Sequence, residues 1–385
     1  MIRKILETTL ILIFSFVYSF KRKNDDIVVF NSYKNEKYNF YSRVLFEYFL
    51  KNKKDLGFIP RFVIDDDKLR CELIDKFGDY FIDSKSLSGI RDCLRAKFWV
   101  SSCKPVYTNP FALLGRVKIN LWHGTPFKKI AIEDKYQSSI KKAVYKYYYS
   151  RFFYTLFVSP SKDVAEKFQR SFNLNDDQLV VTGSVIGEMF GESIDSEINF
   201  KFSKLMKKAR SKKVLYAPTY RDGGVTKFFP FDDIKKEPFE AWLKENDITI
   251  FIRPHHLDVN YKNYLDWDGV EYIGSDIIPE ITFYLNEFDT LITDYSGILF
   301  DYLLTDGKVI LLPYDFESYS FTRGVNYSLE DISCGHVIYD YDHFLNALIS
   351  NESQSFQRDK IKKTFHSVNE LQCNKIHQLM KEYND

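Results

Sequence analysis

The stretch NLWHGTPFKKI places a histidine where an apolar run meets a tight turn. His123 ends the run, Gly124 and Thr125 begin the turn, and Lys128 adds positive charge beyond it. An imidazole titrates near neutral pH and can accept a proton from a hydroxyl group. In open α/β sheets, ligands bind at such strand ends. We therefore predict His123 as a general base; a hydrogen-bonded structural histidine is the ordinary alternative.

A second apolar run ends in IFIRPHH and delivers Arg253 and His255 to another strand end. A guanidinium is permanently charged and its N–H fork fits a phosphate, while a protonated imidazole can neutralise a developing oxyanion. The pattern predicts a phosphate ligand in Arg253 and a second catalytic histidine in His255, with His256 as a bystander. The alternative is a capping or core pair.

The run TLITDYSGILFDYLL is the best formed of these stretches. A strand over residues 290–293 leads through Asp294 to Ser296 and Gly297, and a helix follows. The unpaired N–H groups and the dipole at a helix start attract anions, so we predict a phosphate site there. Simple N-capping by Asp294 or Ser296 is the commoner role of such residues, and the two roles are compatible.

Two further turns offer groups suited to a diphosphate. YAPTYRDGG supplies Thr219 and Arg221 before the pair Gly223-Gly224, and YDFESYSFTRG supplies Arg323. A plain loop explains the first turn equally well. The sequence contains no P-loop, GxGxxG, GxSxG or HExxH motif, which removes support for Walker-type kinases, dinucleotide dehydrogenases, α/β-hydrolases and zincins.

The elements around these residues alternate between strand and helix. The first half holds the apolar runs IVVF, FIPRFVID, KFWVSS and VKINLW, and the second half LVVTG, KVLYAP, ITIFIRP, VEYIG, TLITDY and KVILLP. Near-continuous apolar strands separated by helices predict parallel sheets covered on both faces. We predict an α/β chain with an N-terminal domain over 26–175 and a C-terminal domain over 176–385. The helical run at 354–383 is a candidate to cross back to the first domain.

Composition limits the classes of partner. The 385 residues include 54 Lys and Arg against 53 Asp and Glu, so no basic field indicates nucleic acid. The 5 cysteines are scattered without metal or disulfide spacing, which predicts a chain that faces the cytosol and no metal site built from the protein. The 27 Tyr and 35 Phe favour a surface at which amphipathic rings meet a membrane.

Two segments are candidates for that surface. Residues 1–25 carry an apolar stretch from Thr9 to Phe20 between basic residues, too short for the roughly 20 residues of a membrane span. An interfacial membrane helix, a helix packed on the first domain, and a signal or anchor are the alternatives. The segment DKYQSSIKKAVYKYYYSRFFYTLF mixes cations with aromatic residues, which suits a helix on anionic lipid or a buried aromatic face with solvated lysines.

Taken in order, LWHGTPFK, VLYAPTYRD, FIRPHH, LITDYSGILFDY and YDFESYSFTRG resemble the CDP-glycerol glycerophosphotransferase family, the teichoic-acid primases and polymerases of bacterial cell walls. Weaker matches at VVFNSY and FVSPSKDVAEKF extend the resemblance over nearly the whole chain. The resemblance implies a GT-B architecture, with two Rossmann-like domains facing across a cleft and the nucleotide held mainly by the C-terminal one. It matches His123 and His255 to two essential histidines, and Ser296 with Gly297 to a phosphate-binding helix start.

The chain also departs from the family pattern. Residues 183–188 read GSVIGE where the family shows a Gly-x-Pro-Arg-x-Asp turn, and Gly297 replaces the usual second serine. The first change bears on the identity of the donor or acceptor more than on the chemistry. Related domains occur in capsule and other surface-polymer enzymes.

The resemblance implies transfer of glycerol phosphate, or a related alditol phosphate, from CDP-glycerol to a hydroxyl group of a lipid-linked saccharide or growing polymer, with release of CMP. The diphosphate would lie near Ser296, Arg253, Thr219 and Arg221, and the acceptor near His123. Attachment to the cytoplasmic face of the membrane follows. No cofactor is certain, and assistance by Mg²⁺ stays open because no convincing carboxylate pair is visible. The alternatives are a GT-B glycosyltransferase with a nucleotide-sugar donor and a non-catalytic membrane scaffold.

Overall fold

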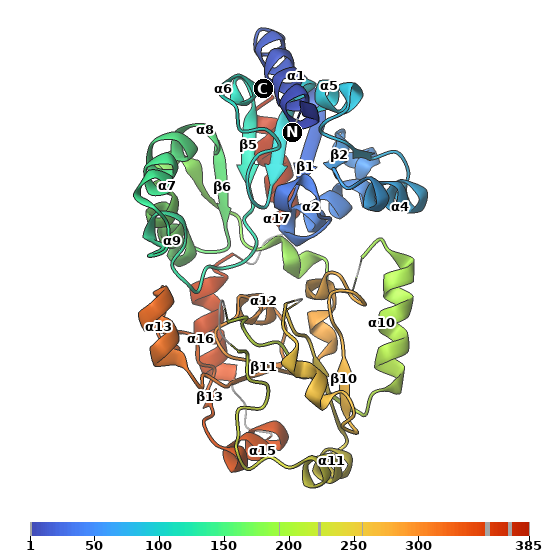
Figure 1. Cartoon of the computed structure of the whole chain (residues 1–385), viewed down its shortest axis with the longest axis vertical. Helices are drawn as coiled ribbons and strands as arrows, with labels where there is room; N and C mark the ends of the chain where they lie inside the picture. The colour runs from blue at the N-terminus through green and yellow to red at the C-terminus, as the bar shows by residue number, and fades with distance from the viewer. Residues whose placement is uncertain are drawn as a thin grey trace. The chain divides into compact units, whose positions relative to one another are not determined.

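The computed structural model of the chain describes residues 2–191, 193–221, 225–255, 257–350, 355–368 and 372–384. It separates into two compact units. Unit 1 comprises Met1–His123, Ile130–Glu188 and Ser367–Asp385, and unit 2 comprises Gly124–Lys129 and Met189–His366. Each unit contains one sheet with helices around it (Figure 1). The predicted pair of Rossmann-like α/β sheets is confirmed.

The sheet of unit 1 has seven parallel strands in the order β3-β2-β1-β4-β5-β6-β7. Residues 28–30 of β1 and 98–100 of β4 at its centre are buried and are β-branched or aromatic, as strands covered on both faces require. The strands are β1 (Asn24–Asn31), β2 (Ile59–Val63), β3 (Phe81–Ile82), β4 (Ala96–Ser101), β5 (Val117–Asn120), β6 (Leu156–Ser159) and β7 (Leu179–Val181).

The sequence analysis grouped LVVTG with the strands of the second half of the chain, and this was wrong. The segment forms strand β7 of the first sheet. It pairs with β6 through Phe157↔Leu179 and Val158↔Val180 and forms the edge of the first sheet. Its three residues are only half-buried. An edge strand carries the same apolar pattern as any other short strand, so its sequence does not reveal which sheet it joins. Unit 1 accordingly continues to Glu188, beyond the boundary that the sequence suggested at 175.

The helices of unit 1 follow from local signals, of which α9 is an example. Ser161 accepts a hydrogen bond from the N–H of Val164 and caps the helix, whose apolar face buries Phe168 and Phe172. Asn173 ends it in the left-handed conformation. The helices are α1 (Ile2–Ser19), α2 (Phe40–Lys51), α3 (Lys53–Leu56), α4 (Asp67–Phe77), α5 (Leu87–Arg95), α6 (Pro110–Leu113), α7 (Ser139–Val144), α8 (Ser150–Phe152), α9 (Lys162–Phe172) and α17 (Gln372–Glu382), with a π-helical turn at Tyr145–Tyr149.

Helix α1 packs on unit 1 against α5 and α6 (Figure 1). Phe16 meets Phe111 of α6 edge to face, and Ser15 accepts a hydrogen bond from Asn109. Other apolar side chains of α1, such as Leu6 and Ile13, are exposed. None of the helices within the described residues combines the length and the apolar character that a bilayer span needs.

The sheet of unit 2 has six parallel strands in the order β10-β9-β8-β11-β12-β13. Counted from β8, this is the 3-2-1-4-5-6 order of dinucleotide-binding folds. The strands are β8 (Lys212–Tyr216), β9 (Ile248–Ile252), β10 (Val270–Tyr272), β11 (Thr290–Thr293), β12 (Lys308–Leu311) and β13 (His336–Val337). One face of the sheet packs on an aromatic core that includes Phe229, Phe239 and Phe344.

The helices of unit 2 cover this sheet: α10 (Ser196–Lys208), α11 (Lys236–Glu245), α12 (Ile298–Tyr302), α13 (Phe316–Arg323), α14 (Leu329–Ile332), α15 (Tyr341–Ile349) and α16 (Ser355–Phe365). After α16 the chain returns to unit 1, where α17 packs against the first sheet's helices. His377 contacts the carbonyl oxygen of Leu56 at 3.0 Å, and Tyr48 bonds to Asn374.

A buried histidine joins α16 to α12. Nε2 of His366 donates to the carbonyl oxygen of Phe300 at 2.7 Å, and Phe365 packs on the ring of Phe300 at 4.5 Å. Burial lowers the pKa of His366 to about 4, the backbone bond opposes this shift, and the charge of Lys362 adds to it. The imidazole is therefore neutral in the folded protein.

This pKa predicts a loss of stability in mild acid. Because the unfolded chain binds a proton at His366 near pH 6.5 and the folded chain does not, stability is complete above that pH and falls as the pH approaches 4. The loss from this group should reach about 3 kcal/mol. Denaturant unfolding at pH 7 and pH 4.5 measures it, and His366→Gln should show a smaller difference between the two pH values. An equal pH dependence in both proteins would contradict the assignment.

Candidate functional site

Some residues of the predicted site lie near the point where the strand order of each sheet reverses. This happens between β1 and β4 in unit 1 and between β8 and β11 in unit 2. Open α/β sheets bind ligands at such points, beyond the carboxyl ends of the strands. In unit 2, Thr219 follows β8 and Asp294 follows β11, and the two are hydrogen-bonded. In unit 1, Asn31 ends β1 and donates to the carbonyl oxygen of Lys104, just beyond β4.

His123 lies on the surface of unit 1, three residues beyond β5, and its ring is held on three sides. Phe40 and Trp122 stack on it with centroid distances of 4.9 and 4.2 Å. Nδ1 lies 2.9 Å from the carbonyl oxygen of Ser102. Since a carbonyl only accepts, Nδ1 carries the proton in this bond and the lone pair of the neutral ring belongs to Nε2. The Sγ atom of Cys103 lies 3.8 Å from Nδ1.

The backbone around His123 is strained. Trp122 and Phe40 have φ values of +53° and +64°, and Lys34 and Asn35 nearby have +55° and +60°. A non-glycine residue in such a conformation costs of order 1–3 kcal/mol, and such residues cluster at functional sites. All four residues line one cavity of about 560 Å³ together with His123. Favourable packing elsewhere in the folded chain must therefore offset the free-energy cost of these backbone conformations.

Asp294 is the hub of the predicted site in unit 2. Its buried carboxylate accepts hydrogen bonds from the N–H and the hydroxyl of Thr219 at 3.0 and 2.6 Å, and from the N–H of Tyr295 at 2.6 Å. Arg221 adds a bond of 2.9 Å from Nη2. The carboxylate thus ties the turn after β8 to the turn after β11 and does not cap α12.

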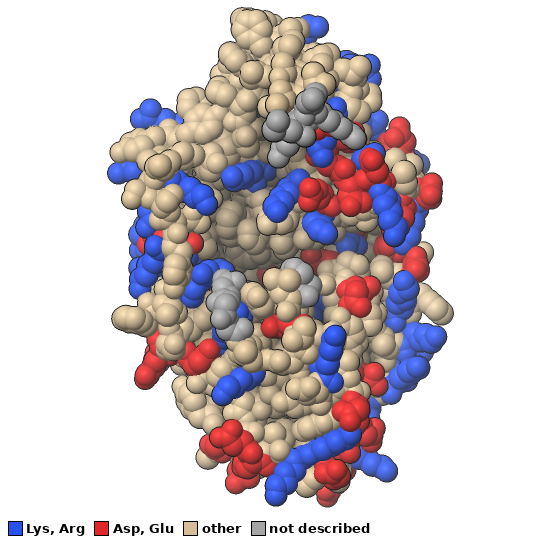
Figure 2. All heavy atoms as spheres, in the orientation of Figure 1, with Lys and Arg blue, Asp and Glu red and all other residues tan. Residues whose placement is uncertain are grey.

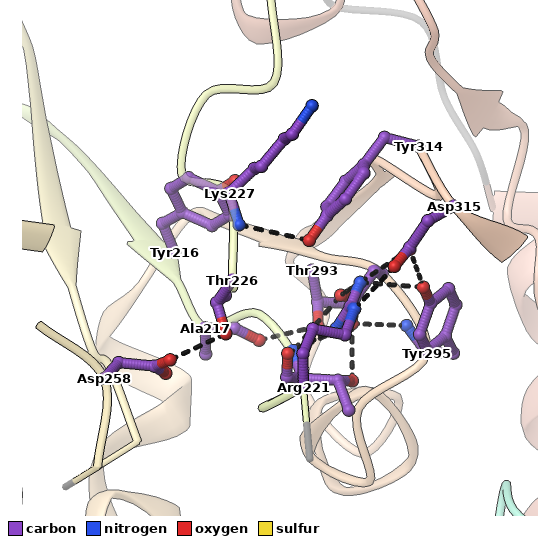
Figure 3. Close-up of polar contacts among 12 residues, drawn as sticks. Tyr216, Ala217, Arg221, Thr226, Lys227, Asp258, Thr293, Tyr295, Tyr314 and Asp315 are labelled. Carbon is purple, nitrogen blue, oxygen red and sulfur yellow. Dashed lines mark hydrogen bonds and ion pairs between the residues drawn. The ribbon is translucent and has the colours of Figure 1, made fainter. Parts of the chain in front are cut away.

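Arg221 is committed to protein acceptors (Figure 3). Nε and Nη2 both donate to Asp315 at 2.8 Å, Nη2 also donates to Tyr295 at 2.7 Å, and Nη1 donates to the carbonyl oxygen of Thr219. Burial alone would lower the pKa of Arg221, but Asp315 and Asp294 raise it. For the carboxyl group of Asp315, burial would raise the pKa, but the hydrogen bonds from Arg221 and Tyr295 lower it. Binding of a diphosphate by Arg221 stays a prediction that requires some of these bonds to be exchanged.

The guanidinium of Arg253 is also hydrogen-bonded to acceptors of the protein itself. Nη1 donates to the carbonyl oxygens of Ile273 and Ile278 at 3.0 and 2.8 Å, and Nη2 reaches that of Pro279 at 3.3 Å. Desolvation lowers the pKa of Arg253 to about 10, so it stays charged at neutral pH. The guanidinium braces the loop after β10, and its predicted role as a phosphate ligand is untested.

His255 follows β9 and its ring stacks on Tyr220 at 4.5 Å. The N–H of Leu257 points to Nδ1 at 3.4 Å, and Asp258 accepts a bond from the N–H of His255 at 3.2 Å. A backbone N–H only donates, so Nδ1 is the acceptor and the neutral ring carries its proton on Nε2. His255 therefore adopts the opposite tautomer to His123. His256 and Gly223-Gly224 lie outside the described residues.

Ser296 and Gly297 are half-buried and precede α12, which is only five residues long. Gly297 has a helical φ of −57° and no side chain caps the helix. Capping by Asp294 or Ser296, the commoner role that the sequence suggested, is not observed. A short helix has a small dipole, so an anion here would depend on the local N–H groups more than on the helix as a whole.

The peptide after His123 belongs to unit 2. The segment Gly124–Lys129, called the strap below, runs beside Gly324–Asn326: Lys129 N–H donates to the Gly324 carbonyl at 3.0 Å, and Asn326 N–H donates to the Phe127 carbonyl at 2.7 Å. Lys128 forms an antiparallel bridge with Val325. Thr125 is buried, and its carbonyl oxygen lies 3.9 Å from where a Cβ on Gly297 would stand.

The strap brings three predicted stretches together. Its neighbour Arg323 is the last residue of α13, directly before Gly324. Phe127 stacks on Tyr295 at 5.7 Å, next to Ser296. The segments GTPFKK, TDYSG and FTRG therefore meet within unit 2. Across the residues that the structure describes, no three His, Cys, Asp or Glu side chains are grouped so that they could hold a metal ion.

Sequence reasoning missed several residues of the site. Phe40 and Asn31 come from the first sixth of the chain, and Asp315 lies in the YDFESYSFTRG stretch, where only Arg323 was selected. The signal for Asn31 was present, because Asn31 ends the first strand and Ser32 directly follows it. For Asp315 the signal was a carboxylate shortly after β12. No local pattern marks Phe40 as the partner of an imidazole.

Comparison with known proteins places these features in a family. The profile of the family described as CDP-Glycerol:Poly(glycerophosphate) glycerophosphotransferase matches residues 13–378. The teichoic acid poly(glycerol phosphate) polymerase of Bacillus spizizenii is 23% identical over 88% of this chain and 86% of its own length. The teichoic acid glycerol-phosphate primase of Bacillus subtilis is 26% identical over 66% of this chain and 67% of its own.

The fold has a close solved relative. A structure of the wall teichoic acid polymerase TagF aligns with a TM-score of 0.72 and 18% identity, covering 99% of this chain and 97% of the other. At this level of identity the match concerns the fold, and it agrees with the GT-B architecture that the motifs imply.

Two glycines of the site should respond differently to a methyl group. Gly124 has a φ of +125° and open space around it, so Gly124→Ala should destabilise the protein through backbone strain of about 1–3 kcal/mol. Gly297 has a helical φ, and an added Cβ would make only ordinary contact, so Gly297→Ala should change stability by less than about 0.5 kcal/mol. Thermal unfolding of both variants tests this pair. Equal effects would show that the strap does not hold Gly124 in this conformation.

Proposed function

Because the chain belongs to the CDP-glycerol:poly(glycerophosphate) glycerophosphotransferase family, we propose that it transfers glycerol phosphate, or a related alditol phosphate, from CDP-glycerol to a hydroxyl group of a lipid-linked saccharide or growing polymer. CMP is released. The observation that carries this proposal is the family match along residues 13–378, which takes in all five motif stretches and both histidines. The relatives are primases and polymerases of teichoic acid, so synthesis of such a surface polymer is the corresponding cellular role.

His123 is the general base in this proposal. Its bond from Nδ1 to the Ser102 carbonyl leaves the lone pair of the neutral ring on Nε2, which accepts the proton of the acceptor hydroxyl. The acceptor oxygen then attacks the β-phosphorus. A bond forms between them, and the bond from that phosphorus to the bridging oxygen breaks, so this oxygen and its electron pair leave with CMP.

His255 supplies the complementary group. Its Nδ1 accepts from Leu257, so its Nε2–H can donate to an oxygen of the diphosphate and stabilise the charge that grows there. Phosphoryl transfer needs mostly positioning and neutralisation of oxygens. Two histidines in opposite tautomers meet both needs, one as an acceptor and one as a donor.

The strap lies beside the predicted phosphate site of unit 2. The carbonyl oxygen of Thr125 lies near Gly297. Lys128 and Arg323 lie along the same segment of unit 2.

Removing the base should abolish turnover and leave donor binding intact. His123→Ala is expected to lower kcat by about 10²- to 10⁴-fold, the usual contribution of a general base. CMP release from CDP-glycerol measures the rate. Stabilisation against heat by CDP-glycerol should persist, because the donor residues lie in unit 2 and a ligand that binds the native state raises its stability.

The matched control is His343→Ala, since His343 is a well exposed histidine that bonds to Asp340 on α15. It should keep full activity. A folded His123→Ala variant with normal turnover would remove His123 from the role of base. Stabilisation by UDP-sugars in place of CDP-glycerol or CDP-ribitol would instead support a glycosyltransferase of the same fold.

Peripheral attachment to the cytoplasmic face of an anionic membrane completes the proposal. The end of unit 1 that carries α1 is covered mostly by residues without charge (Figure 2). Exposed apolar side chains gather there on α1 and α6, which we call the α1–α6 surface: Leu6, Ile13, Phe16, Val17, Phe111 and Leu114. Lys21 and Arg22 follow α1 and suit anionic headgroups.

The second predicted segment continues this surface. Tyr148 donates to the carbonyl oxygen of Thr108, two residues before α6. In the segment itself Ile140 and Tyr147 are exposed, whereas Phe153 and Tyr154 are buried. The sequence left two alternatives open for this segment, a helix on anionic lipid and a buried aromatic face. Both have support, because some aromatic residues lie in the core of unit 1 and others lie on the surface beside lysines.

Apolar residues of α1 should be needed for vesicle binding. The double variant Leu6→Ser, Ile13→Ser should bind vesicles of phosphatidylglycerol at least about tenfold more weakly, because each buried leucine or isoleucine contributes about 1.5–3 kcal/mol. Co-sedimentation at low and high salt measures binding. The control Val259→Ser, Phe321→Ser changes two exposed apolar residues of unit 2 and should bind normally. Equal binding by both variants would contradict attachment through α1.

A further inference from the structure

Asn120 is a buried residue that joins the two loops around the ring of His123. It ends β5 and is 1% exposed. Its Nδ2 atom donates to the carbonyl oxygen of Cys103 at 2.6 Å and to the hydroxyl of Ser101 at 3.3 Å. Its Oδ1 atom accepts the N–H of Trp122 at 2.8 Å. One amide therefore connects the loop that follows β4 to the loop that follows β5.

The loop after β4 carries the group that sets the tautomer of His123. The carbonyl oxygen of Ser102 lies 2.9 Å from Nδ1 of the imidazole, and Ser102 stands between the two residues to which Asn120 donates. The hydroxyl of Ser102 in turn accepts the N–H of Ser42, in the first turn of α2, at 2.8 Å. Because the side chain of Ser102 and both of its neighbours are held, its carbonyl has little freedom to turn away from the imidazole.

A second group near the ring would favour the other tautomer. The Sγ atom of Cys103 lies 3.8 Å from Nδ1 of His123. Burial raises the pKa of this thiol to about 12, so it keeps its proton at neutral pH. A thiol is a weak donor, and its S–H can donate to Nδ1 only when the neutral ring carries its proton on Nε2. In that tautomer Nε2 has no lone pair and cannot act as the base. A small shift of the Ser102 carbonyl away from Nδ1 would therefore favour the inactive tautomer.

The loop after β5 fixes the plane of the ring. An asparagine whose Oδ1 accepts the N–H two residues further on forms an Asx turn, and this turn holds Trp122 at a φ of +53°. In that conformation the indole stacks on His123 with a centroid distance of 4.2 Å. A left-handed backbone is unfavourable for a bulky residue, so loss of the bond to Asn120 would let Trp122 relax and leave the imidazole.

We propose that Asn120 is a positioning residue of the transfer reaction. Its amide holds the Ser102 carbonyl and the Trp122 ring against His123, and it thereby keeps the lone pair of the imidazole on Nε2. The inference rests on the proposed function, because it takes His123 as the base. An amide with a purely structural role would stabilise the two loops and would change neither the tautomer nor the rate of the folded enzyme.

The variant Asn120→Ser tests this role. A serine hydroxyl can still accept the N–H of Trp122 in the corresponding turn, but it lacks the amide donors that hold Cys103 and Ser101. We expect kcat to fall by about 10- to 100-fold, because a displacement of about 1 Å can cost 10²-fold in rate. The KM for CDP-glycerol should not change, since the predicted donor residues lie in unit 2. Release of CMP from CDP-glycerol measures both. Asn120→Thr lacks the same donors and suits a strand end, so it replaces the serine variant if that protein does not fold.

Nitrogen-15 NMR measures the tautomer directly in the full chain. With labelled histidine at about pH 8, where an ordinary imidazole is neutral, the shifts of the two ring nitrogens show which one carries the proton. His123→Ala identifies the signals of this ring among the 7 histidines. The unmodified protein should carry the proton of His123 on Nδ1, and both Asn120 variants should show a larger share of the tautomer protonated on Nε2.

The matched control is Gln178→Ser. Gln178 is another buried amide of unit 1, and its Nε2 atom also donates to two carbonyl oxygens, those of Ser150 and Tyr154, at 2.8 and 2.7 Å. Because it loses comparable hydrogen bonds, this variant should lower the Tm by a similar amount. Its kcat and the tautomer of His123 should be normal.

Other results would overturn the role of Asn120. An unchanged tautomer or a normal kcat in its folded variants would do so, and so would an equal loss of kcat in Gln178→Ser. If the unmodified protein released no CMP from CDP-glycerol while the Asn120 variants still shifted the tautomer, the proposed function would be rejected and the hold of Asn120 on His123 would stand. Normal CMP release by the unmodified protein, with an unchanged tautomer in the variants, would do the reverse.

Discussion

The hydrogen bonds between the strap and Gly324–Asn326 are the constraint on which the proposed chemistry depends. They hold the peptide that follows His123 in unit 2, while β5 and the Ser102 carbonyl hold His123 itself in unit 1. An imidazole on an unattached loop would have to be ordered at each turnover. Here both sides of the residue are anchored, and rate depends steeply on the position of a catalytic group.

The charged groups divide into those that organise the protein and those that remain for ligands. The N–H groups of Arg221 and Arg253 donate hydrogen bonds to carboxylates and carbonyls near the ends of strands. A buried guanidinium requires such partners, because an unpaired charge in the interior is very costly. Their effect on a bound diphosphate would therefore be to shape the loops around it, whereas Lys128 lies on the strap and Arg323 directly precedes the strap's partner Gly324.

The cavity beside His123 in unit 1 is organised in a different way. Its wall is aromatic, and four of its residues adopt a left-handed backbone conformation that costs free energy. Packing of α2 and of the β5 loop must outweigh that cost. The result is a cavity with an aromatic wall in unit 1 and a polar, hydrogen-bonded hub in unit 2.

The two parallel α/β sheets and the strand ends that carry His123, His255 and Asp294 could be predicted from the amino-acid sequence, because burial on both faces and tight turns leave local patterns in the chain. The five motif stretches also identified the family. Three features could not be predicted in this way: β7 joins the first sheet, Asp315 pairs with Arg221 across 94 residues, and Asn326 donates to the Pro126 carbonyl across 200. Local periodicity indicates how deeply a segment is buried. Which polar group it meets is set by contacts between segments far apart in the chain.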